Sequence, residues 1–281
     1  MRTASRLCAA TVGLALLASP AVANANPATA PTTGAPTCAV QSTQSEQQRL
    51  VALTDVGTLA GIEDARARVV EINELLAARG DNRGTFSLVY KEILDKTIPA
   101  LTDGTFRDPR WARNLSVDFV TRYLENFHAH LTGGTPTPYW QSFFDLAADC
   151  DRSPARVVGE GISTHLVVDF PDSLIAVDTR TRHLRDYTVY GEALVEAAPG
   201  IVERMREYYG VDMQPFFQLW LVGEVFGETT ATTALFQSVR AVAWTNAVGL
   251  RLHERHARTK IDRTWRAAGV VLDGLEKTGK I

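Results

Sequence analysis

Apolar residues recur at helical spacing along most of this chain, and that pattern constrains its fold more than any other feature. In residues 62–78, for example, Val69, Ile72 and Leu76 fall three or four positions apart, which places them on one face of an α-helix. No stretch shows the sustained period-two alternation of β-branched residues that is typical of strands. The sequence therefore predicts an all-α fold.

Capping signals divide this pattern into separate helices. Asp108 and Ser153 each precede a proline, which is the order expected for an N-cap followed by the first helical residue. We expect a compact bundle of about eight to ten helices. The expected helices cover residues 62–78, 86–101, 109–131, 139–148, a segment from 154 onward that carries His165 and Asp169, 186–197, 201–208, 215–226, 232–256 and 262–277. Pro171 should kink the segment that begins at residue 154.

The first 26 residues have the three parts of a secretory signal. Arg2 and Arg6 precede a short apolar run over residues 7–17, and small residues follow at 21–25. We therefore expect residues 1–26 to be removed and the mature protein to be secreted. No later segment has the 18 or more uninterrupted apolar residues of a membrane span. Residues 27–44 read as a flexible arm rich in Pro, Thr and Ala, and residues 45–281 as a single helical domain.

Export changes the interpretation of the cysteines. Cys8 would leave with the signal, so Cys38 and Cys150 would remain in an oxidising compartment, where two cysteines most simply form one disulfide.

The charge balance argues against nucleic-acid binding. The 29 basic residues are dispersed among 32 acidic ones, for a net charge of −3, and they form no basic stripe. A nucleic-acid partner is therefore not expected.

The strongest candidate site is His165 with Asp169, in the apolar sequence GISTHLVVDFPDSL at residues 161–174. Four residues apart on a helix, the two side chains leave the same face one turn apart. Such a pair can supply two ligands to a metal such as zinc, or orient the imidazole as a general base. It can equally be a buried hydrogen-bonded pair that holds one helix against its neighbours. A separate apolar helix carries Glu224, for which Arg240 is a plausible counter-ion.

The order of motifs along the chain resembles that of a family of uncharacterised helical proteins common in actinobacteria. The motifs are NRGTFSLVY at residues 82–90, RDPRWARNLSVDFVTRY at 107–123, PYWQSFF at 138–144, the segment 161–174, then Asp186 with Tyr187, and residues 240–244. The family signature resembles G-M-N-A-H-I-x-x-D-L-P. This chain departs from it at residues 162–164 and at Phe170. The resemblance implies a helical fold with a clustered polar core, and it implies no activity.

The resemblance also implies a set of site residues, namely Phe86, Tyr90, Arg122, Tyr123, Trp140, His165, Asp169, Tyr187, Arg240 and Trp244. Two hypotheses follow. In the first, the chain is a secreted hydrolase centred on His165 and Asp169, either with a divalent metal such as zinc or by general-base catalysis. Arg122, Tyr123 and Arg240 would then orient the reacting groups or hold an anion. In the second, it is a non-catalytic module that binds a small apolar molecule or a protein partner, and the same residues form a structural network.

Overall fold

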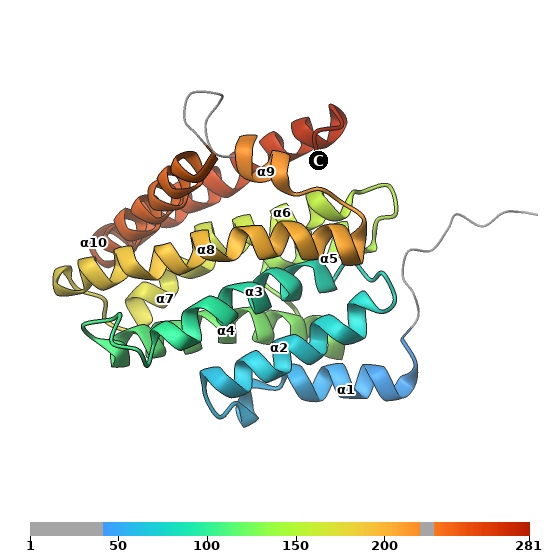
Figure 1. Cartoon of the computed structure of the whole chain (residues 1–281), viewed down its shortest axis with the longest axis horizontal. Coiled ribbons are helices and arrows are strands. Elements are labelled where there is room, and N and C mark those ends of the chain that lie inside the picture. The colour runs from blue at the N-terminus through green and yellow to red at the C-terminus, as the bar shows by residue number, and fades with distance from the viewer. Residues whose placement is uncertain (1–41, 220–227) are drawn as a thin grey trace, which may run out of the picture. The chain divides into compact units, whose positions relative to one another are not determined.

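A computed structural model describes residues 42–219 and 228–281, and every regular element in these ranges is helical (Figure 1). The predicted all-α, multi-helix bundle is thereby confirmed. The signal-like residues 1–26, most of the arm and Cys38 lie outside the described residues. Secretion and the Cys38–Cys150 disulfide therefore stay predictions.

The first half of the bundle follows the capping signals of the sequence. It comprises α1 (Gln44–Thr54), the 3₁₀ turn η1 (Val56–Thr58), α2 (Ile62–Ala77), α3 (Gly84–Ala100), α4 (Pro109–Thr132) and α5 (Pro138–Ala148). The carboxylate of Asp108 accepts a hydrogen bond from the backbone N–H of Trp111 at 3.0 Å, which caps α4 as predicted. Gly133 ends α4 in the left-handed conformation, with φ 73°, which favours glycine.

The second half differs from the prediction in the continuity of α8 and in the position of a helix break within α10. It comprises α6 (Pro154–Ser163), the π-helical turn η2 (Thr164–Asp169), α7 (Phe170–Ala176), η3 (Thr181–His183), α8 (Leu184–Tyr209), α9 (Gln214–Leu219) and α10 (Glu228–Lys277). The two helices expected at 186–197 and 201–208 are one helix, α8. Pro199 removes only one backbone hydrogen bond there, and the buried apolar residues on both sides of it keep the helix continuous.

The helices expected at 232–256 and 262–277 are both present within α10, where two helices meet at a kink at His253, with φ −147° and ψ 63°. The sequence therefore predicted both helices, but it placed the break between them a few residues too late. The helix expected at 215–226 appears as α9, and its second half lies outside the described residues.

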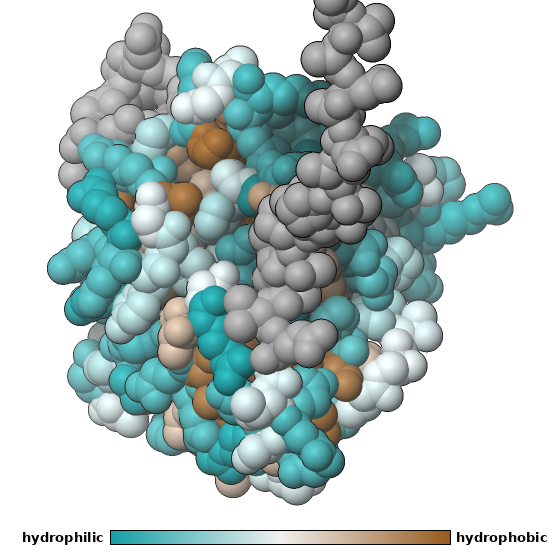
Figure 2. Space-filling view, turned by 90° about the vertical axis from the view of Figure 1, so that its right-hand side faces the viewer, coloured by the Kyte–Doolittle hydropathy of each residue, from teal (hydrophilic) through white to brown (hydrophobic). Residues whose placement is uncertain are grey.

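The core that positions the site lies around α3. This helix packs against α2, α6 and α8, and α10 packs against α6, η2, α7 and α8. Large aromatic side chains fill the centre, among them the fully buried Trp140, Tyr123 and Phe86. On the face drawn in Figure 2, hydrophilic residues predominate and hydrophobic ones are scattered. None of the helices in the described ranges has both the length and the apolar character needed to span a bilayer.

Candidate functional site

His165 and Asp169 lie on η2, a π-helical turn between α6 and α7. The backbone N–H of Phe170 bonds to the carbonyl of His165, five residues earlier. Pro171, which follows, has no N–H to donate and so cannot continue the normal α-helical pattern. The sequence predicted a kink at this proline, and the structure places a widened turn immediately before it. Single π-helical turns of this kind are frequent at functional sites.

The structure brings the two candidate side chains together. The carboxylate oxygen Oδ2 of Asp169 lies 2.9 Å from Nδ1 of His165, and it accepts a second hydrogen bond, also of 2.9 Å, from the indole N–H of Trp140. An ionised carboxylate can only accept, so Nδ1 must carry the proton of the neutral imidazole. The other ring nitrogen, Nε2, therefore presents a lone pair. In the described part of the chain, this buried atom has no hydrogen-bond partner.

Aromatic rings fix the orientation of the imidazole. The ring of Phe119 on α4 stacks on it, with the centroids 3.5 Å apart and the planes 11° from parallel. Tyr90 and Phe86 of α3 contact it edge-on, at centroid distances of 5.2 and 5.3 Å. His165 is 3% exposed, and this burial lowers its pKa, an effect that the hydrogen bond to Asp169 only partly opposes. His165 is therefore neutral near pH 7.

A glycine allows α6 to approach α3 at this point. A Cβ atom on Gly161 would lie 2.8 Å from a ring carbon of Phe86, closer than van der Waals contact permits. Any larger residue would force a shift of Phe86, whose ring contacts the imidazole of His165. Gly161 begins the motif GISTHLVVDFPDSL, and its lack of a side chain lets the ring of Phe86 reach the site.

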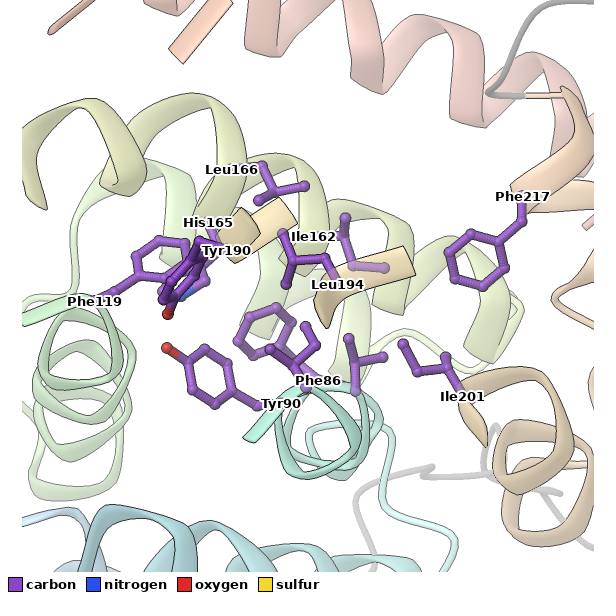
Figure 3. Close-up of a pocket in the computed structure, with 12 residues that line it drawn as sticks. Phe86, Tyr90, Phe119, Ile162, His165, Leu166, Tyr190, Leu194, Ile201 and Phe217 are labelled. Carbon is purple, nitrogen blue, oxygen red and sulfur yellow. The ribbon is translucent and has the colours of Figure 1, made fainter. Parts of the chain in front are cut away.

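His165 lines a small, largely apolar cavity of about 30 Å³ (Figure 3). The walls come from α3, α4, α6, η2, α8 and α9, and comprise Phe86, Val89, Tyr90, Ile93, Phe119, Ile162, His165, Leu166, Tyr190, Leu194, Ile201 and Phe217. The polar members are His165 and two tyrosines. Tyr190 shares a hydrogen bond of 3.0 Å with Ser116. Burial raises the pKa of both Tyr90 and Tyr190, so each keeps its hydroxyl proton near pH 7.

The two predicted partners on α4, Arg122 and Tyr123, make different contacts. Arg122, on α4, donates to Asp118 at 2.9 Å and to Ser173 at 2.8 Å, and its side chain is partly exposed. Tyr123 is buried nearer the site, where it packs against the rings of Phe86 and Trp140.

Arg240 is fully buried, and its guanidinium lies 4.1 Å from the centre of the Tyr187 ring. Burial lowers the pKa of Arg240 to about 10. The hydroxyl of Tyr187 donates to the backbone carbonyl of Arg240 at 2.5 Å, which ties α8 to α10. Glu224, its predicted counter-ion, lies outside the described residues.

The residues present do not fit a zinc centre. A protein-built zinc site needs at least three ligands from His, Cys, Asp or Glu. Across residues 42–219 and 228–281 no group of three or more such side chains is placed to hold a metal ion. His165 and Asp169 provide two donors, and they are hydrogen-bonded to each other. The metal-dependent version of the first hypothesis therefore receives no support from the donor set.

Sequence reasoning missed three residues that complete the site. Phe119, Tyr190 and Ser116 were not among the candidates, although the first stacks on the imidazole and the other two form a hydrogen-bonded pair. Helical spacing could have found two of them. Phe119 lies one turn before Tyr123 on α4, and Tyr190 one turn after Tyr187 on α8.

The chain belongs to a family of unknown function, DUF5995, whose profile matches residues 62–274. The match begins at the first residue of α2 and ends within α10, so it includes every residue of the site described above. The predicted membership of an uncharacterised helical family is thereby confirmed. Searches of curated proteins and of solved structures find no match.

Proposed function

We propose that the chain binds a small, mostly apolar molecule carrying a hydroxyl group, with that hydroxyl donating to Nε2 of His165. The observation that carries this proposal is the buried, unpartnered Nε2 of His165, a residue that lines an otherwise largely apolar cavity. A buried polar atom without a partner costs about 1–3 kcal/mol, which a ligand donor would recover. The hydroxyl of Tyr90, which lines the same cavity, can donate to the ligand oxygen in return.

The size of the cavity supports a small polar group at the imidazole end. A volume of about 30 Å³ exceeds the roughly 10–15 Å³ that a water molecule needs. A ligand hydroxyl would therefore fit where a water fits. The remainder of the ligand would lie against the apolar walls and displace side chains such as Leu166 and Phe217.

The test compares two probes that differ in one proton donor. We expect 1-hexanol to bind the purified protein about threefold to tenfold more tightly than its methyl ether, which accepts hydrogen bonds but cannot donate one. Tryptophan fluorescence is a suitable readout because the indole of Trp140 bonds to the same carboxylate as His165. The ¹⁵N chemical shift of Nε2 should change with the alcohol and not with the ether.

Variants separate the hydrogen bond from general effects on folding. His165→Phe keeps a ring against Phe119 and removes the acceptor, so it should abolish the preference for the alcohol. His183→Phe is the matched control, because His183 is equally buried but stacks on Trp111 and does not line the cavity. Equal binding of alcohol and ether by the unmodified protein would refute the proposal.

A second candidate function rests on the hydrogen bond between Asp169 and His165. A carboxylate that holds Nδ1–H leaves Nε2 able to accept a proton from a bound substrate or water, the arrangement of a general base. Hydrolysis of p-nitrophenyl butyrate tests this function. General-base catalysis predicts turnover that is lost in His165→Phe and reduced in Asp169→Asn. Alcohol binding without turnover would leave the binding function alone.

A further inference from the structure

The cavity beside His165 follows the axes of two neighbouring helices. On α3 its lining runs from Phe86 to Ile93, which is roughly 10 Å at the helical rise of 1.5 Å per residue. On α8 it runs from Tyr190 to Ile201, roughly 16 Å by the same rise. Because α3 and α8 pack against each other, these two rows face the same space. The lining is therefore several times longer than a single hydroxyl group requires.

The two ends of this lining differ in chemistry. Figure 3 shows His165, Phe119 and Tyr190 at one end, and Ile201 with Phe217 of α9 at the other. The side chains between them are apolar or aromatic, and none of the cavity's lining residues carries a charge other than the titratable His165. The polar anchor therefore lies at one end of an apolar passage.

From this arrangement we infer that the ligand is an unbranched aliphatic chain with a terminal hydroxyl, its head at His165 and its tail directed toward Phe217. The inference rests on the proposed function and adds the shape and orientation of the ligand. Because the cavity has a volume of only about 30 Å³ and so long a lining, the passage that this inference requires is narrow. A straight chain widens such a passage slightly at many points, whereas a ring must displace several close-packed side chains at one point.

Chain length is the first test, carried out on the full chain with 1-butanol, 1-hexanol and 1-octanol, and with cyclohexanol as the ring of matched carbon number. Each added CH₂ should tighten the dissociation constant by roughly fourfold while the tail still lies in the passage. Binding of 1-hexanol should exceed that of cyclohexanol. Dissociation constants that do not fall with chain length, or equal binding of the ring, would overturn the inference and leave the proposed function standing.

Shortening the residue at the far end is the second test. Phe217→Ala should shift the chain length of tightest binding upward by one or more carbons and leave 1-butanol unaffected. Phe217→Leu should shift it less, and serves if the alanine variant does not fold. Phe144→Ala is the control, because Phe144 is a buried phenylalanine that does not line the cavity. The same optimum in all the variants would overturn the inference, and failure of every alcohol to bind the unmodified protein would overturn the proposed function as well.

Discussion

Mild acid should destabilise this protein, because burial holds one histidine in its neutral form. In the folded chain the pKa of His165 is lowered by burial, whereas in the unfolded chain it returns to about 6.5. Below that pH the unfolded state binds a proton that the folded state does not. The free energy of unfolding therefore falls as the pH drops from about 6.5 toward the lower, folded pKa.

The size of the effect follows from linkage. Each such histidine lowers the free energy of unfolding by up to about 1.4 kcal/mol per pH unit over that interval. Burial also lowers the pKa of His130 and His183, so the slope can exceed that of a single group. Carboxylates with lowered pKa values, such as Asp95 and Asp273, lose their contribution only below about pH 4. The histidines should therefore dominate between about pH 6.5 and pH 5.

Urea unfolding at several pH values between about 7.5 and 5 measures this slope. His165→Gln removes the titrating group and still offers Asp169 a hydrogen-bond donor, so its slope should be smaller than that of the unmodified chain. His256→Gln removes an exposed histidine and should leave the slope unchanged. Equal slopes for His165→Gln and the unmodified protein would show that His165 is not held neutral by burial.

Two further predictions concern packing and a buried ion pair. Gly191→Ala should destabilise the chain by about 1–3 kcal/mol in urea unfolding, because the added Cβ would lie 1.7 Å from a guanidinium nitrogen of Arg240. Gly274 has open space around it, so Gly274→Ala should be neutral or should stabilise the chain by up to about 1 kcal/mol. Glu160→Gln should cost about 2–3 kcal/mol, because it removes the charge that pairs with the buried Arg156 at 2.8 Å, and the effect should shrink in an Arg156→Met background.

The helices could be predicted from sequence because their ends are marked by local chemistry. Asp108 and Ser153 each cap a helix through a side-chain oxygen, and that interaction depends only on residues within one turn. Continuity across Pro199 could not be predicted in the same way. It depends on burial of the flanking face of α8 against other helices, which local propensity does not contain.

The site was predictable in part for the same reason. The spacing of His165 and Asp169 places them on one helical face, so their hydrogen bond follows from local geometry. The indole of Trp140 reaches the same carboxylate from a different helix, and no spacing within either segment predicts that contact. Arg122 is the opposite case. It was predicted to act at the site, but its guanidinium forms an ion pair with Asp118, one helical turn earlier.

The arrangement around His165 argues for a ligand more strongly than the pair alone does. Trp140 and Asp169 hold Nδ1 in one protonation state, and the stacked ring of Phe119 holds the plane of the imidazole. These contacts suffice to join the helices, and they leave the lone pair of Nε2 available to a further donor. A hydroxyl-bearing molecule in the cavity would give Nε2 a donor, so a fixed acceptor at one end of an apolar lining favours a ligand that is oriented by its hydroxyl, and binding of that ligand would stabilise the fold.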